Sequence, residues 1–460
     1  MSRFTGVRTM ERPDMAAIPI ELPPAAPASP GVPTGYDWYV VATLFAVSVL
    51  GYVDRVILSF LVEPIKADLA LSDKQVGLVV GTAFAVLYVI GGIFLARVLD
   101  GRRRMPVLAA CIIVWSAGTL VSGLAGGFAL LFVARMLVGV GEAGLNPAAI
   151  SIISDRFDAT RVQRPLGLFT TGLYVGGGLA MMGGGKLLAE LAARPPQQLP
   201  LVGVLEGWRM VFVLLAIPGV VLAVLLLATV RDRQRASPDA PAPAHGGAWR
   251  FVRANAALVT LLATSVVAWS MNNYGLLNWY PAMLMRSHGM TAQDVAWTYG
   301  PAFLLGGMAG CLGAAPVQRA LGRRFGMVLS PFALTLGCMA TLAVTTFAGP
   351  LMPDRGSAVA FAAINMFVSA MSVTSVFILI VAVAPPRMRA LFTGFYMALV
   401  NLTGGAFGSV LVGALTDNVL GAERLNVSLS VMAAVFGPLA TVLMLFAIRI
   451  VRTRGIAAAG

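Results

Sequence analysis

Charged residues are scarce in this chain. Asp, Glu, Lys and Arg together make up 12% of its 460 residues, whereas a soluble domain has about 25%. Hydrophobic residues make up 58%. This composition excludes an ordinary soluble protein and predicts a chain that is buried in lipid over most of its length.

Long apolar runs take the place of the missing charges. A helix needs about 20 apolar residues to cross the hydrocarbon core of a bilayer. Twelve runs meet this requirement: 38–61, 75–99, 105–125, 128–154, 165–191, 208–230, 257–284, 295–316, 326–348, 357–384, 389–416 and 427–450. No stretch alternates between apolar and polar residues in the way of a membrane β-barrel strand. We therefore predict an all-α membrane protein with 12 transmembrane helices.

Cysteine and histidine are rare as well. Cys111, Cys311 and Cys338 each lie singly within an apolar run, without a C-x-x-C pair, so we expect buried thiols and no disulfide framework. His245 and His288 fall in loops between these runs. No imidazole is therefore expected inside the membrane to carry a proton.

The sequence also lacks the short motifs of common enzymes. It contains no G-x-S-x-G nucleophile turn, no H-E-x-x-H zinc motif and no phosphate-binding G-x-x-x-x-G-K-[ST] loop. We therefore expect no enzymatic activity, no cofactor and no metal.

The net charge of +13 is unevenly distributed among the loops. Basic residues gather in every second loop and at both ends of the chain, as expected when these segments are cytoplasmic. The basic loops contain Arg102, Arg103, Arg104, Arg156, Arg161, Arg164, Arg231, Arg233, Arg235, Arg250, Arg253, Arg319, Arg323, Arg324, Arg387 and Arg389. This pattern predicts an inner-membrane protein with both termini in the cytoplasm, and it argues against nucleic-acid binding.

The runs divide into two sets of six. A Pro- and Ala-rich tail, residues 1–35, precedes the first set at 36–231, and a polar linker at 232–253 leads to the second set at 254–451 and a tail at 452–460. We expect the first tail to be disordered and cytoplasmic. An Arg-rich loop follows the second run of each set. The repetition predicts two six-helix bundles, with a substrate site between them near the midplane.

Four charged residues interrupt the apolar runs of the first half: Asp54, Arg55, Arg135 and Glu142. A charge at the centre of a bilayer costs about 2.5–3.5 kcal/mol on insertion scales, and such residues usually mark an ion or substrate path. Arg135 and Glu142 are seven residues apart, so they share one helix face at about 10 Å separation. Asp54 and Arg55 are adjacent and do not face each other. Each charge therefore needs a partner on the other helix, and the sequence leaves open which acid meets which Arg.

These four charges sum to zero when all are ionised. Protonating one carboxylate would leave an Arg without its partner, because Arg keeps its charge. Burial raises the pKa of a carboxyl group and a neighbouring guanidinium lowers it. We expect Asp54 and Glu142 to couple transport to protons, with Arg55 and Arg135 holding the substrate headgroup. A purely structural ion-pair network is the alternative.

The second half has polar residues but no charge within its apolar runs. We expect the following to line a cavity: Asn272, Asn273, Tyr274, Asn278, Trp279, Ser372, Tyr396 and Asn401. Many Met, Phe and Leu residues surround them. One wall of the cavity would then be charged and the other mainly apolar, which suits a substrate with a charged head and an apolar tail.

The loop after the second run resembles the G-x-L-a-D-R-x-G-R-R signature of the major facilitator superfamily. Asp100 and Arg104 match it, whereas Ala96 replaces its first Gly and Gly101 replaces its first Arg. The resemblance implies that Asp100 and Arg104 belong to a loop that controls conformational change.

Two further motifs resemble the spinster branch of that superfamily. Gly51-Tyr52-Val53-Asp54-Arg55 is similar to N-Y-x-D-R, and the segment from Arg135 to Ala143, R-M-L-V-G-V-G-E-A, is similar to R-G-L-V-G-x-G-E-A. Trp279 and Pro281 fit W-x-P in the seventh helix. The eleventh helix departs from the family pattern, because Asn401 and Gly405 replace its His and first Asp.

The spinster resemblance implies a proton-coupled transporter of lipid-like amphiphiles, such as lysophospholipids or sphingosine phosphates, working by alternating access. Two other transport functions stay open: proton-coupled transport of small organic anions, and export of drugs or cations in exchange for protons. We expect a monomer whose partners are protons, an amphipathic substrate and membrane lipids.

Overall fold

The computed structural model describes residues 33–101, 104–158, 161–192, 197–199, 203–232, 245–326, 328–385 and 388–454. Twelve helical segments in these ranges are long and apolar enough to cross a membrane, which confirms the predicted all-α membrane fold. Their ends lie within a few residues of the predicted ones, except around the eighth helix. That helix runs to Phe325 rather than to 316. Its last turns are rich in Arg and remain helical, because long basic side chains can reach from the helix to the membrane–water interface.

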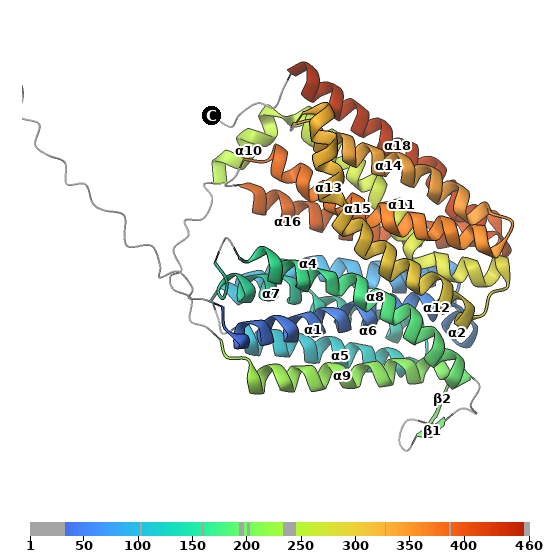
Figure 1. Ribbon diagram of the computed structural model, residues 1–460. Coiled ribbons are helices and arrows are strands. Elements are labelled where there is room, and N and C mark those ends of the chain that lie inside the picture. Colours follow the sequence, from blue (N-terminus) through green and yellow to red (C-terminus); the bar gives the residue numbers. More distant parts are fainter. Residues whose placement is uncertain are drawn as a thin grey trace, which may run out of the picture.

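The N-terminal half contains the first six membrane helices and one small hairpin (Figure 1). The elements are α1 (Gly35–Phe60), α2 (Val62–Leu69), α3 (Asp73–Gly77), the π-helical η1 (Leu78–Thr82), α4 (Ala83–Gly101), α5 (Arg104–Gly123), α6 (Phe128–Glu142), α7 (Leu145–Ser154), α8 (Gln163–Ala192), β1 (Gln197–Leu199), β2 (Gly203–Leu205) and α9 (Gly207–Thr229). The antiparallel hairpin β1–β2 was not predicted; it lies between two membrane helices.

The C-terminal half repeats the six-helix plan. Its elements are α10 (His245–Ala254), α11 (Ala256–His288), α12 (Ala292–Pro301), η2 (Ala302–Gly306), α13 (Gly307–Phe325), α14 (Ser330–Ala348), η3 (Gly349–Leu351), α15 (Arg355–Val383), α16 (Arg389–Val400), η5 (Asn401–Gly408), α17 (Ser409–Leu415), η6 (Thr416–Leu420), η7 (Ala422–Arg424) and α18 (Leu425–Arg454).

Local sequence signals fix several helix starts. Thr34 begins α1 with a capping box: its hydroxyl accepts a hydrogen bond from the Asp37 backbone N–H, and the Asp37 carboxylate accepts one from the Thr34 N–H. Ser72 and Thr291 cap α3 and α12 in the same way. Such caps satisfy backbone donors that have no partner within the helix.

The expected linker and tails lie mostly outside the described residues. Within the linker expected at 232–253, residues 245–254 form the helix α10 instead of an irregular segment. The last membrane helix, α18, runs to Arg454 and so extends into the tail expected at 452–460. The tail expected at 1–35 is described only from residue 33, just before α1 begins.

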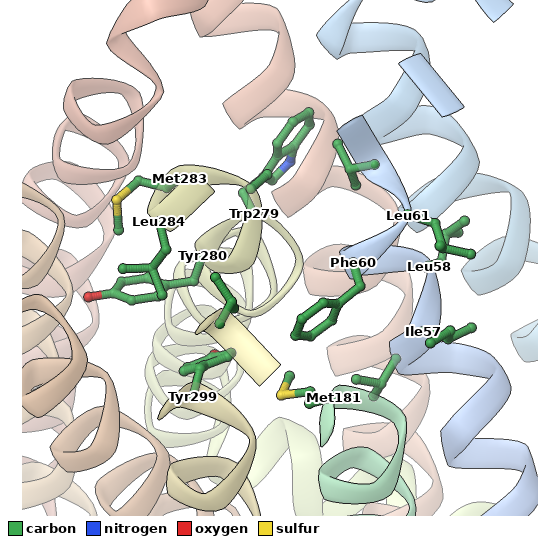
Figure 2. Close-up of a cluster of buried hydrophobic side chains, with 14 of the residues drawn as sticks. Ile57, Leu58, Phe60, Leu61, Met181, Trp279, Tyr280, Met283, Leu284 and Tyr299 are labelled. Atoms are coloured by element: carbon green, nitrogen blue, oxygen red, sulfur yellow. The ribbon is translucent and has the colours of Figure 1, made fainter. Parts of the chain in front are cut away.

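The apolar cores show how the halves meet. We call "basic end" the end of the bundle where α1 begins, α9 and α18 finish and the Arg-rich loops lie; the other end is the "far end". One cluster of buried residues joins both halves at the far end, and Figure 2 shows Phe60 and Met181 of the first half near Trp279 and Tyr299 of the second. Toward the basic end each half has a separate core. The halves are therefore packed together at the far end and apart at the basic end.

Small residues allow this close packing. A Cβ added to Gly77 of α3 would lie 2.7 Å from the backbone oxygen of Ser409 in α17, so any side chain there would push the two halves apart. Thr82 of η1 donates a hydrogen bond of 2.5 Å to the backbone oxygen of Ala406 in η5. The second and eleventh membrane helices thus touch backbone to backbone across the boundary between the halves.

Candidate transport site

The four intramembrane charges form two ion pairs between α1 and α6. Arg55 binds Glu142: its Nη2 lies 2.6 Å and its Nε 3.2 Å from Oε2. Arg135 lies beside Asp54, with 3.6 Å between Nη1 and Oδ1. The prediction left the pairing open; the structure pairs each acid with the Arg of the other helix. The helix of the fourth span ends at Glu142 and resumes at Leu145, so Glu142 lies at the break.

The two pairs differ in their surroundings. The Arg135 side chain is 1% exposed and Asp54 is also buried, whereas the Arg55 side chain is 21% exposed. Asp54 has a second partner, because the Thr119 hydroxyl of α5 donates a hydrogen bond to its Oδ2. The Arg55–Glu142 pair is therefore the one that solvent or a substrate can reach in this conformation.

Three aromatic rings surround the Arg55 guanidinium. Its carbon lies 4.9 Å from the ring centre of Tyr52, 4.3 Å from Phe84 and 5.0 Å from Tyr88. Each distance is within the range of a cation–π interaction. Phe84 also lies 6.0 Å from the Arg135 guanidinium, so this one ring borders both ion pairs.

A glycine on α6 brings Phe84 to this position. A Cβ added to Gly139 would clash with the backbone oxygen of Phe84, so α4 can approach α6 closely only because residue 139 has no side chain. The close approach places the Phe84 ring within 6.0 Å of both guanidinium groups.

Several buried atoms of this cluster have no hydrogen-bond partner among the described residues: Oδ1 of Asp54, Nε and Nη1 of Arg135 and Oε1 of Glu142. Leaving a buried polar group unpaired costs about 1–3 kcal/mol, and more for a charged group. The cluster thus keeps capacity to bind a proton or the oxygens of an anion.

The polar residues predicted to line the second wall fall into two groups. Tyr274 and Asn401 lie together, since the Tyr274 hydroxyl donates a hydrogen bond to Asn401 Oδ1 at 3.4 Å. Tyr396 lies five positions before Asn401 on the same membrane helix. A Cβ added to Gly405 of η5 would lie 3.1 Å from the Cβ of Ala85 in α4 and 3.9 Å from the Tyr274 ring. These residues therefore lie where the C-terminal half meets α4, the helix that carries Phe84.

The other predicted cavity residues serve mainly in packing between helices. Asn272 is buried and donates to Thr346 of α14 at 2.9 Å; Trp279 is buried and donates to the Ser409 backbone oxygen at 3.0 Å; Ser372 is fully buried. Asn272 and Trp279 face neighbouring helices, which corrects the prediction that they line an accessible wall. The buried Ser372 hydroxyl has no hydrogen-bond partner among the described residues. Asn278 and Asn273 are half-buried and bind Ser409 and Ser369.

Arg104 of the predicted loop motif is buried and binds two acids. Its Nη2 lies 2.5 Å from Asp155 Oδ2, just after α7, and its Nε lies 3.5 Å from Asp232 Oδ1, after α9. Its Nη1 also donates to the Ser151 hydroxyl at 2.6 Å. Arg104 therefore ties three helix ends of the first half together at the basic end. The side chain of Asp100 lies outside what the structure describes.

A charged network that the sequence did not predict closes the far end. Arg286 at the end of α11 binds both carboxylate oxygens of Asp73 at 2.8 Å and Glu63 Oε1 at 2.6 Å. Lys66 binds Asp73 as well, at 2.6 Å. Asp417 of η6 accepts hydrogen bonds from the backbone N–H groups of Asp73 and Lys74 at 3.1 and 2.6 Å. Two residues of the second half thus hold the first turn of α3.

We expect Arg286→Met to weaken closure of the far end. Asp73 is fully buried, so losing Arg286 removes one of its two cationic partners and leaves Lys66. Breaking a buried pair outright costs about 3–5 kcal/mol, which is the upper bound for this change. A cysteine introduced at buried Ala296, in a background without the native cysteines, should then react faster with a membrane-impermeant maleimide. Arg355→Met is the control, because Arg355 lies at the same end and binds only backbone oxygens of its own half. Equal reactivity in the two variants would contradict a closing role.

Sequence reasoning missed this network and the rings around Arg55. Asp73 and Arg286 are 213 positions apart in the sequence. Taken singly, each is an ordinary charged residue near the end of an apolar run, so nothing in the sequence indicates that they pair. Ser72 caps α3 through local hydrogen bonds, which do not indicate a partner in the other half. Tyr52 is part of the motif Gly51-Tyr52-Val53-Asp54-Arg55 in the first helix. Residues three apart are neighbours on a helix surface, so this spacing could have suggested an aromatic ring beside the Arg55 guanidinium.

Comparisons with known proteins identify the family. The model of the Major Facilitator Superfamily matches residues 44–409. An MFS-type efflux pump of Mycolicibacterium smegmatis is 31% identical over 403 residues, covering 86% of this chain and 89% of the pump. The hexuronate transporter of Bacillus subtilis is 26% identical over 393 residues, covering 82% and 87%. Human protein spinster homolog 1 is 27% identical over 417 residues, covering 85% and 75%.

Solved structures agree with these relatives. A bacterial homologue of the human lysosomal transporter spinster, in an inward-facing and unoccupied conformation, superposes with a TM-score of 0.76 at 24% identity, covering 90% of this chain and 98% of that one. These relatives and this fold are those of transporters, not enzymes. The chain therefore belongs to the major facilitator superfamily, and its predicted resemblance to the spinster branch is confirmed.

Proposed function

We propose that this transporter moves lipid-like amphiphiles, of the lysophospholipid or sphingosine-phosphate type, in a proton-coupled cycle of alternating access. The observation that carries the proposal is the asymmetry of the two halves. Asp54, Arg135 and Glu142 are buried in the N-terminal half beside Arg55, whereas the described part of the C-terminal half has no buried charged side chain. A substrate with a charged head and an apolar tail complements such a pair of walls.

Proton coupling follows from the two ion pairs. Protonating Glu142 would release Arg55, which the aromatic rings hold in place, and Arg55 could then bind an anionic headgroup with its planar donor groups. Protonating Asp54 would remove the ion-pair partner that Arg135 has among the described residues and leave its guanidinium beside the Phe84 ring. We assign Asp54 and Glu142 to proton coupling and Arg55 and Arg135 to the headgroup.

Alternating access needs a closed end and an end that can open. The far end is closed by the shared apolar cluster and by the network around Asp73, while the cores separate toward the basic end. We infer that this conformation faces the side of the membrane where the basic end lies, and that Asp100 and Arg104 help to control the transition.

We place the basic end in the cytoplasm, because Arg-rich loops are retained on the cytoplasmic side of a membrane. We also place the protein in the inner membrane, as a monomer. Single cysteines at Ala240 in the Arg-rich linker and at Ala292 at the start of α12 test this orientation. An impermeant maleimide added to intact cells should label position 292 and leave position 240 unlabelled until the cells are permeabilised. Labelling of both from outside would contradict the topology.

The substrate class is tested by direct uptake. Purified protein in liposomes should take up a labelled lysophospholipid, and unlabelled sphingosine phosphate should compete with it. Glucuronate and a cationic dye serve as the competing substrate classes. Uptake of either of these without uptake of the lysophospholipid would reject the proposal.

A small organic anion is the second candidate. It is favoured by the 26% identity to the hexuronate transporter of Bacillus subtilis, and Arg55 and Arg135 would bind a carboxylate as well as a phosphate. The similarity to an efflux pump supports drug export in the same way. The uptake panel separates the three.

A further inference from the structure

A buried hydroxyl group links Asp54 to the backbone of α5. The Thr119 hydroxyl lies within hydrogen-bond distance of Oδ2 of Asp54 and of the backbone oxygen of Trp115, one turn earlier on α5 and 3.0 Å away. Thr119 is 1% exposed and Asp54 is 2% exposed. A threonine hydroxyl has one proton to donate and can also accept a hydrogen bond. Thr119 can therefore donate to only one of these two oxygens at a time.

The two carboxylate oxygens of Asp54 face different groups. Oδ1 lies 3.6 Å from Nη1 of Arg135 and has no hydrogen-bond partner among the described residues. Arg has donors only, so it cannot accept a hydrogen bond from a protonated carboxyl group. Oδ2 lies against the Thr119 hydroxyl, whose oxygen can accept one. A proton that binds Asp54 therefore has an acceptor on the Oδ2 side and faces a donor on the Oδ1 side.

Glu142 differs from Asp54 in this respect. Its Oε2 accepts two hydrogen bonds from Arg55, and its buried Oε1 has no hydrogen-bond partner among the described residues. A proton on Oε2 would displace the bonds from Arg55, and a proton on Oε1 would lack an acceptor in the described part of the chain. A buried donor without an acceptor is unfavourable. Of the two acids, Asp54 is the one whose neutral form finds a hydrogen-bond acceptor in place.

The charged groups close to Asp54 belong to the same cluster. Arg55 follows it on α1, and Arg135 and Glu142 lie on α6. Helix α5 has no charged residue after its first one, Arg104. The helices α8, α9 and α11 also pack against α1, and their charged residues lie toward the ends of the bundle, such as Arg164, Lys186, Arg209 and Arg286. The protonation of Asp54 therefore depends on the cluster itself and on Thr119.

We propose that the coupling proton binds Oδ2 of Asp54 and that Thr119 is the positioning residue that holds it there. The inference rests on the proposed function. While Asp54 is ionised, Thr119 donates its hydrogen bond to Oδ2. When a hydronium ion delivers the proton, one of its O–H bonds breaks and an O–H bond forms on Oδ2. The new O–H donates to the Thr119 oxygen, and Thr119 keeps its own proton and turns it to the Trp115 backbone oxygen.

This exchange requires the rotation of one hydroxyl group and no movement of the helices. Oδ1 of Asp54 still faces Arg135 after the proton has bound, so the guanidinium keeps its position and loses only its counter-charge. Nε and Nη1 of Arg135 are buried and have no hydrogen-bond partner among the described residues. An anionic headgroup can then supply both the charge and the acceptors. Thr119 thereby lets protonation of Asp54 change the charge balance at Arg135 without disturbing its geometry.

Infrared difference spectra of the full chain in nanodiscs, recorded between alkaline and acidic buffer, test this proposal. The carbonyl band of protonated Asp54 is the band that the wild type shows and Asp54→Asn lacks. A carboxyl group that donates a hydrogen bond absorbs at lower wavenumber than one that does not. Thr119→Val keeps the size of the side chain and removes the hydroxyl, so the band should shift to higher wavenumber. Thr119→Ser returns the hydroxyl and should restore the wild-type band.

Ser122→Ala is the matched control on the same helix. Ser122 is buried three residues after Thr119, and its hydroxyl donates to the backbone oxygen of Gly118. Its loss should leave the Asp54 band unchanged. Thr119→Ala removes the same hydroxyl as Thr119→Val and replaces that variant if thermal unfolding shows that it does not fold.

Two results would overturn the proposal. An Asp54 band at the same wavenumber in the wild type and in Thr119→Val would mean that Thr119 does not hold the proton. A protonated carboxyl band that persists in Asp54→Asn and disappears in Glu142→Gln would assign the proton to Glu142. The absence of any band that depends on Asp54 counts with the second result.

These spectra do not require transport. If the Asp54 band shifts as expected and lysophospholipid is not taken up, the proposed substrate fails and the proton site stands. If lysophospholipid uptake moves protons and the band does not respond to Thr119→Val, the proton site fails and the proposed function stands.

Discussion

Asp54→Asn and Glu142→Gln are expected to flatten the pH dependence of transport while the protein still folds. Each amide mimics a permanently protonated acid of the same size. Among the described residues the other buried acids, Asp37 and Asp73, lie near helix starts, and both histidines lie at helix ends. The effect of Asp54→Asn should be the larger, because Arg135 is 1% exposed and would lose its counter-charge, whereas Arg55 keeps three aromatic rings and 21% exposure.

The measurement is the initial rate of uptake against pH for each variant and for the pair. Asp68→Asn is the control, because Asp68 pairs with Arg209 outside this cluster in the same half. If only one variant loses the pH dependence, that residue carries the proton and the other is a structural partner. If both keep the wild-type profile, the proton binds elsewhere and the mechanism is wrong.

Arg135→Lys is expected to lower transport strongly although it keeps the charge. Lys lacks the planar donor groups that hold two oxygens at once. A hydrogen bond to a charged group contributes about 1.5–3 kcal/mol, so losing one should reduce the transport rate by about tenfold or more. Uptake of lysophospholipid and thermal unfolding, measured on the same preparation, separate lost function from lost folding.

Arg324→Lys provides the comparison for this variant, because Arg324 is exposed at the basic end. It should transport at the wild-type rate. Near-normal transport by Arg135→Lys as well would mean that Arg135 only balances the charge of Asp54.

Most of the fold could be predicted from the sequence. Length and apolarity alone define membrane helices. Lipid offers no hydrogen-bond partners, so a backbone that crosses it singly must satisfy its N–H and C=O groups within a helix. The four charges of the site could be found for the same reason: a carboxylate or guanidinium within an apolar run is costly and stands out. Because Asp54 and Arg55 cannot face each other, the sequence also predicted that each charge has its partner on the other helix, but it left open which acid meets which Arg.

What could not be predicted depends on contacts between distant parts of the chain. Asn272 and Trp279 are polar residues on a membrane helix, and only the packing against α14 and α17 turns them away from a cavity. The pairing of Arg286 with Asp73 depends on how the two halves meet at the far end. Phe84 is one of many aromatic residues in the sequence, and its position beside both guanidinium groups requires the close approach at Gly139.

The central claim, that an amphiphile and protons share one cycle through these ion pairs, is tested most directly by substrate-driven proton movement. Proteoliposomes with a pH-sensitive dye inside receive a lysophospholipid gradient and no pH gradient. The account predicts that the internal pH changes with wild-type protein and stays constant with the Asp54→Asn, Glu142→Gln double variant. Lysophospholipid uptake by the wild type without any change in internal pH, or an equal change with the double variant, would contradict it.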